Sequence, residues 1–123
     1  MKYACLIYGD GNLVDPLPPE EIEKLEADGL AFDHELRRSG HFITAQALER
    51  ADAATTIRRR NGELSMTDGP FAETKEQLGG FFLIEARDLN EAIRIASAHP
   101  CTHWDSIEIR PVRELYPARD AQR

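Results

Sequence analysis

Hydrophobic and polar positions along the chain predict two strand–helix–strand units. Residues 2–8 are rich in apolar and aromatic side chains and predict a first strand. From residue 18 to residue 40, apolar residues recur every three or four positions, which predicts a helix with one apolar face. That face carries Ile22, Leu25, Gly29, Phe32 and Leu36. Proline and acidic residues at the start of this segment, and Ser39 with Gly40 at its end, are typical of helix boundaries.

The middle of the chain predicts three further strands. A second strand is expected at 41–48, where alternation places one set of side chains on each face. The two sets are His41, Ile43, Ala45 and Ala47, and Phe42, Thr44, Gln46 and Leu48. Asn61-Gly62 is a strong hairpin signal and joins the strands expected at 55–60 and 63–67.

Residues 80–112 predict the second unit. The nearly continuous apolar run 80–86 is typical of a strand covered on both faces, so one of Phe81 and Phe82 should face away from the helices. Asp88, with Glu91 three positions later, predicts the start of a helix. The buried stripe of this helix is expected to contain Leu89, Ala92, Ile93 and Ala96. Residues 106–112 then form the last strand.

This order of elements predicts an α+β fold of the ferredoxin-like kind. It reads βαβ, hairpin, βαβ, with an antiparallel sheet and both helices on one face. Apolar side chains on the other face of the sheet would lack a cover, which indicates a partner, and we expect a homodimer. The 123 residues fit a single domain, 1–123, with a polar, frayed tail after about residue 116.

Composition narrows the choice of partners. The net charge of −7 opposes a general affinity for nucleic acid or for an anionic membrane. No run approaches the roughly 20 apolar residues that span a bilayer. Two cysteines do not make a disulfide framework, and we expect a cytoplasmic protein that keeps them reduced. The run Arg58-Arg59-Arg60 is a local exception, either a charged edge strand that discourages aggregation or a patch for phosphate or carboxylate.

The turn Asp68-Gly69-Pro70-Phe71 after the hairpin carries the strongest candidate for chemistry. Asp, Gly and Pro each disfavour the continuation of a strand. Asp68 either accepts backbone N–H bonds and fixes the bend, or acts as a base or as the group that orients a histidine. The polar loop 73–77 follows, and such a loop can close over a cleft.

Two histidines are candidates to work with that carboxylate. His41 opens the second strand at the rim of the sheet, where it either moves protons or bonds a backbone carbonyl. His34 lies on the first helix, nearly opposite its apolar face. His99 stands at the end of the second helix, where a cation suits the helix dipole. No spacing matches a metal site or a phosphate cradle, so we expect no metal and no cofactor.

Four residues are candidates for a small-molecule pocket. Thr44 and Gln46 share a strand face, Tyr8 ends the first strand and Phe71 closes the turn. A few polar groups in an apolar hollow are typical of a ligand site.

The sequence from Thr67 to Ala92, TDGPFAETKEQLGGFFLIEARDLNEA, resembles the signature of the YciI-like (YCII-related) proteins of the DGPF type. The resemblance extends from MKYACLIYG at the start to EIRPV near the end. It implies a fold that pairs two sheets face to face as a dimeric α/β barrel. It also implies a His–Asp pair in a cleft, with the histidine on the first helix. This chain offers Asp68 with His34 on that helix, or with His41 beyond it.

Two functions from different classes follow. The first is a cofactor-independent enzyme that acts on a small organic molecule in the dimer cleft by His/Asp acid–base chemistry. The second is a non-catalytic ligand-binding or regulatory module, because the resemblance associates such proteins with sigma-factor-type transcription control. A third alternative is a stable dimer whose signature serves folding alone.

Overall fold

The computed structural model describes residues 1–10 and 16–115, so the tail expected after about residue 116 and most of the first loop lie outside the described residues. The strands are β1 (Lys2–Gly9), β2 (Phe42–Ala47), β3 (Thr55–Arg60), β4 (Glu63–Asp68), β5 (Gln77–Glu85) and β6 (Ser106–Pro111). The helices are α1 (Pro19–Arg38) and α2 (Leu89–Ser97), with short 3-10 turns η1 (Ala51–Ala53) and η2 (Pro100–His103). The predicted order of strands and helices is confirmed.

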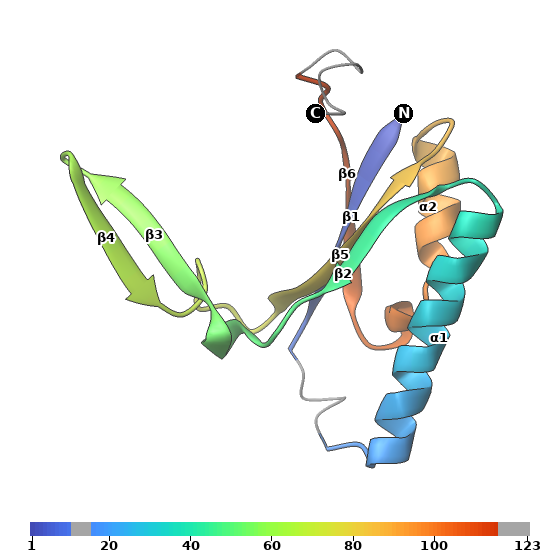
Figure 1. The fold of residues 1–123 in the computed structure, drawn as a ribbon, viewed down its shortest axis with the longest axis horizontal. Helices are drawn as coiled ribbons and strands as arrows, with labels where there is room; N and C mark the ends of the chain where they lie inside the picture. The colour runs from blue at the N-terminus through green and yellow to red at the C-terminus, as the bar shows by residue number, and fades with distance from the viewer. Residues whose placement is uncertain (11–15, 116–123) are drawn as a thin grey trace.

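Four strands form one antiparallel sheet in the order β2-β5-β1-β6. Both helices lie on the same side of this sheet (Figure 1). The α+β class is therefore confirmed, and the arrangement is compatible with a ferredoxin-like fold. None of the described helices is both long enough and apolar enough to cross a bilayer.

The core lies between the sheet and the helices. Alternating residues of the central strands, Tyr3 and Cys5 on β1 and Phe82 and Ile84 on β5, are almost fully buried there. Phe81 is only partly buried and points to the opposite, helix-free side, which we call the open face. The expected division between the two phenylalanines is therefore settled, with Phe82 inward and Phe81 outward.

The alternation predicted for β2 is wrong because this strand contains an irregularity. Phe42 pairs with Ile84, whereas Thr44, two residues on, pairs with the adjacent Leu83, so β2 carries one extra residue. After the shift Ala45 returns to the helix side, and both Phe42 and Ala45 pack against the core. A bulge of this kind leaves no trace in a simple count of alternating positions.

The buried stripe predicted for α2 is only half correct. Ala92 and Ala96 are buried, and Ile95 packs against the core. Leu89 and Ile93 are instead 47% and 44% exposed. The helix presents its small residues to the sheet and leaves two larger apolar residues toward solvent.

The start of α2 is fixed by a reciprocal cap. The Asp88 carboxylate accepts the N–H of Glu91 at 2.9 Å, and the Glu91 carboxylate accepts the N–H of Arg87 at 2.8 Å. Glu91 also forms ion pairs with Arg87 and Arg94, each at 3.3 Å. These contacts satisfy the N–H of Glu91, a donor that the first turn of a helix leaves without a partner, and the N–H of Arg87 just before the helix.

Replacing Asp88 by alanine is therefore expected to lower the free energy of unfolding by about 1 kcal/mol, within a range of about 0.5–2 kcal/mol. Urea unfolding followed by far-UV circular dichroism measures this change. Asp88→Asn keeps an acceptor at the cap and should stay close to the wild type. Equal losses in both variants would show that the charge, and not the cap hydrogen bond, matters.

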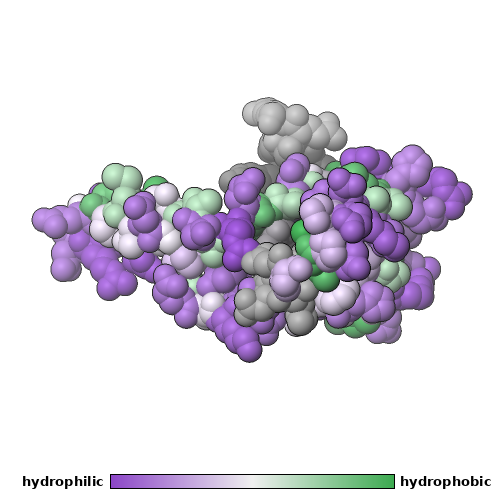
Figure 2. All heavy atoms as spheres, turned by 90° about the horizontal axis from the view of Figure 1, so that it is seen from below, coloured by the Kyte–Doolittle hydropathy of each residue, from purple (hydrophilic) through white to green (hydrophobic). Residues whose placement is uncertain are grey.

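Strands β3 and β4 form a separate two-stranded sheet, and we call residues 55–68 the arm. Asn61 and Gly62 have φ angles of 51° and 80°, which confirms the predicted tight hairpin turn. The arm extends away from the body on the side opposite the helices (Figure 1). In the space-filling view it is a distinct projection with apolar and polar side chains at its surface (Figure 2).

Candidate functional site

A cavity of about 530 Å³ lies between α1 and the adjoining ends of β2 and β5, and we call it the His99 cavity. Its apolar wall includes Phe82, Leu30 and Ile7. Its polar groups come from distant parts of the chain and are Glu26, Asp33, Gln46, His99, Cys101 and Asp105. A mainly apolar hollow with a few converging polar groups is the usual form of a small-molecule site.

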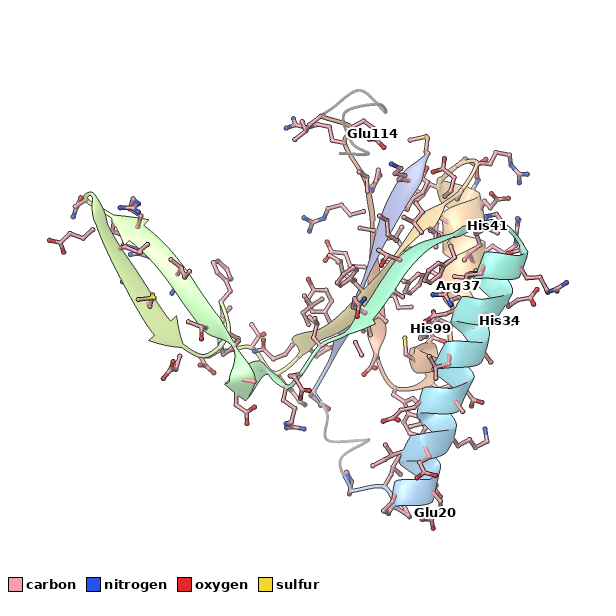
Figure 3. All side chains as sticks on the ribbon, in the orientation of Figure 1. Glu20, His34, Arg37, His41, His99 and Glu114 are labelled. Atoms are coloured by element: carbon pink, nitrogen blue, oxygen red, sulfur yellow. The ribbon has the colours of Figure 1, made fainter. Side chains whose placement is uncertain are left out.

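His99 is held by aromatic packing between the sheet and α1 (Figure 3). Its ring stacks on Phe82, with centroids 5.2 Å apart and planes 16° apart, and lies 4.6 Å from the Phe32 ring. The backbone N–H of Cys101 donates to Nδ1 at 3.0 Å. Because Nδ1 accepts this bond, the proton of the neutral ring resides on Nε2.

Burial lowers the pKa of His99 below its ordinary value, while the negative charge of Asp33 acts in the opposite direction. The hydrogen bond to Nδ1 also disfavours a second proton on the ring. A cation at the end of α2 is therefore disfavoured, since the imidazole is partly buried and its pKa is lowered. The unfolded chain binds this proton at a higher pH than the folded chain, so lowering the pH from 7 toward 5 destabilises the fold.

Two carboxyl groups of the His99 cavity, those of Asp33 and Asp105, have raised pKa values. Burial raises the pKa of Asp33, and the charges of His99 and Arg37 partly offset it. Burial also raises the pKa of Asp105, as do the nearby charges of Asp10 and Glu76. The Asp33 carboxylate is therefore a stronger base than an ordinary one, and its charge interacts with that of the imidazole.

Cys101 lines the same cavity but is not a nucleophile at neutral pH. Burial first, and the charge of Asp105 second, raise the pKa of its thiol to about 12. Since the thiolate is the reactive form, this residue acts as a small apolar part of the wall.

The three residues expected to form a His–Asp pair do not come together within one chain. Asp68 ends β4 on the arm, whereas His34 lies on α1 and His41 precedes β2 on the helical side of the body (Figure 3). Nδ1 of His41 lies 2.8 Å from the carbonyl oxygen of Glu85, which is the structural alternative foreseen for this residue. Among the described residues, no backbone N–H donates to the Asp68 carboxylate, so that group does not fix the bend.

The turn is held instead by its backbone. The N–H of Gly69, whose φ is 117°, donates to the carbonyl of Ala54 at 2.7 Å. The Thr56 hydroxyl donates to the carbonyl of Gly69, and the Arg58 guanidinium to that of Phe71. Ala54 and the first residues of β3 therefore hold the turn Asp68–Phe71 in place through hydrogen bonds.

The four residues expected to form a pocket are divided between two places. Tyr8 and Phe71 line a second hollow of about 630 Å³ between the base of the arm and the sheet. Thr44 and Gln46 pair with Leu83 and Phe81 and lie on the open face, and Gln46 also borders the His99 cavity.

Sequence reasoning missed the pair formed by Asp33 and His99. The two residues are far apart in the chain and share no motif spacing, and only the packing of α1 over the sheet brings them together. The adjacent Phe32, which the periodicity assigns to the core, was the available signal, because its neighbour stands at the edge of the buried face. Within the described residues, no group of three or more histidine, cysteine or carboxylate side chains could hold a metal ion.

Comparisons with known proteins agree with the signature in the sequence. The YCII-related domain matches residues 1–116. An uncharacterized protein of Rhizobium meliloti (strain 1021) is 39% identical over 121 residues, which cover 95% of this chain and 96% of the relative. The chain therefore belongs to the YCII-related family.

Proposed function

We propose that the His99 cavity binds a small organic molecule and transfers a proton within it, without a cofactor. One observation carries this proposal: a neutral, partly buried imidazole and a carboxylate of raised pKa interact across one mainly apolar cavity. Perturbed acid–base groups in a cavity are the usual mark of proton-transfer chemistry.

The proposed roles follow from the protonation states. Asp33 takes a proton from a carbon next to a carbonyl group, and the electron pair of that C–H bond moves toward the carbonyl oxygen. The Nε2–H of His99 donates a hydrogen bond to this developing oxyanion, as a neutral imidazole can. Return of the proton from Asp33 to the same carbon, on the same or the opposite face, re-forms the carbonyl group. The net change is proton exchange or inversion at that carbon, and no electrons are gained or lost.

The charges around the cavity limit the substrate. Glu26, Asp33 and Asp105 line it, and no lysine or arginine of the described chain does so. An anionic carboxylate or phosphate ester would face these three carboxylates with no lining lysine or arginine to pair with, so we propose a neutral or cationic carbonyl compound as the substrate.

We also propose that the chain works as a cytoplasmic homodimer. Leu6, Phe81 and Leu83 lie partly exposed on the open face, and a second sheet laid on it would bury them. Buried free thiols such as that of Cys5 fit a reducing compartment. Pairing of Asp68 with His34 or His41 remains a prediction that needs the second copy.

The first test is the titration of the histidine ring protons by NMR. We expect His99 to titrate below about 6.5, the ordinary histidine value. Asp33→Asn removes the charge that favours the imidazolium, so it should lower the pKa of His99 further. Asp28→Asn, on the same helix but paired with Lys24, is the matched control and should leave His99 unchanged.

The second test measures exchange of substrate C–H protons for deuterium in D₂O, with a panel of neutral carbonyl compounds. His99→Gln should lower the exchange rate by about 10²–10⁴-fold. Compounds that bind without exchange would instead indicate a ligand-binding or regulatory module. A pKa of His99 that does not respond to Asp33→Asn would contradict the pair itself.

A further inference from the structure

One face of the arm exposes a cluster of apolar side chains. Ile57 lies directly opposite Met66, and Leu64 lies opposite Arg59, so the register places these residues on a single face. Ile57, Leu64 and Met66 are 62%, 52% and 71% exposed. We call this cluster the bare face of the arm.

The opposite face of the arm is partly covered by its own chain, at Thr56 and Arg58. The Thr56 hydroxyl donates to Gly69, and Arg58 both donates to the Phe71 carbonyl at 2.8 Å and lies 5.3 Å over its ring. The signature turn therefore folds back under one side of the hairpin. Among the described residues, no comparable hydrogen bonds or ring contacts cover Ile57, Leu64 or Met66.

A hairpin with one uncovered apolar face is not stable by itself. An isolated two-stranded sheet is at best marginal in water and needs a packing surface. The described strands of the body form a separate sheet and do not pair with the arm. The arm projects on the side of the open face (Figure 1). Leu6, Phe81 and Leu83 are partly exposed on that face.

We propose that the bare face of the arm packs on a second copy of this chain, so that each arm of the dimer contacts the body of the other copy. A two-fold axis would make both contacts identical, and each arm would continue the apolar surface formed by the two open faces. Charge supports a second copy as the occupant. Arg59 lies on the bare face, in a run of three arginines, while the chain as a whole has a net charge of −7.

The same arrangement would place Asp68 at the contact between the two copies. This carboxylate ends β4 opposite Thr55 and shares the face of Ile57 and Met66. In the dimer it would be presented to the second copy.

The test compares Met66→Asp with Thr67→Asp by sedimentation equilibrium over a range of concentrations. The two positions are adjacent on β4, both are exposed, and they face opposite sides of the arm. We expect Thr67→Asp to assemble like the wild type, and Met66→Asp to raise the dimer dissociation constant at least tenfold. Circular dichroism confirms that both variants are folded.

A third variant, Phe81→Asp, separates the arm from the sheet. If Phe81→Asp breaks the dimer while Met66→Asp does not, the copies meet through the open faces alone and the arm proposal is wrong. A wild-type chain that stays monomeric at hundreds of micromolar would also overturn it. Hydrogen exchange gives an independent readout, since amides of β3 and β4 should gain protection as the protein concentration rises.

Discussion

Replacing Phe82 by alanine is expected to lower the free energy of unfolding by about 3–5 kcal/mol, the range typical for a buried phenylalanine. Phe82 is 1% exposed on a central strand. It packs edge-on against Phe32, with centroids 5.7 Å apart, and stacks against His99. These neighbours come from α1 and from the segment just after α2, so neither can move in alone to fill the cavity that the smaller side chain leaves.

Phe81→Ala is the matched control for this prediction. It makes the same change one residue earlier on β5, but on the open face, where the side chain is only partly buried. Urea unfolding at low protein concentration should show a clearly smaller loss for Phe81→Ala. Similar losses in the two variants would mean that the open face is as tightly packed as the core. If Phe82→Ala does not fold, Phe82→Leu keeps most of the volume and should cost less.

Replacing Phe82 should also change the pKa of His99 in the candidate site. Stacking on Phe82 is part of what keeps His99 from water, and burial is the main cause of its lowered pKa. In Phe82→Leu, the pKa of His99 should therefore rise toward its ordinary value. Core packing and the protonation state of the cavity are thus set by one contact.

Local signals in the sequence were sufficient for most of the fold. Asn61-Gly62 encodes its own turn, and the Asp88 cap acts within four residues. The apolar face of α1 was also right, because its residues repeat over several turns and end at the buried Leu36. Each of these features depends on neighbours in the chain, which periodicity and turn chemistry describe.

The errors occurred where a neighbouring element decides the outcome. The extra residue in β2 is defined by its pairing with β5, and the orientation of α2 by how closely Ala92 and Ala96 approach the sheet. The pair Asp33 and His99 was missed for the same reason. Asp68 was prominent because it belongs to a compact motif, whereas Asp33 and His99 meet only through tertiary packing.

Gly80→Ala is expected to destabilise the fold by about 1–3 kcal/mol, the usual effect of overpacking. A Cβ at Gly80 would lie 2.9 Å from the carbonyl oxygen of Gln46 and 3.4 Å from Cα of Ala47. Both atoms belong to the backbone of β2, an edge strand that pairs only with β5 within the sheet. We therefore expect β2 to move outward, which would widen the His99 cavity beside Gln46.

Gly79→Ala provides the comparison, because Gly79 is the adjacent residue and also lines the His99 cavity. No atom lies within 4 Å of a Cβ built at this position, so the added methyl group has room. Its effect on stability should stay within about 0.5 kcal/mol. Thermal unfolding of the two variants tests the difference, and the NMR shift of the His99 ring reports movement of the cavity wall. If both variants unfolded at the same temperature, the prediction would be wrong. β2 would then move aside without a loss of stability, and it would form a flexible wall of the cavity.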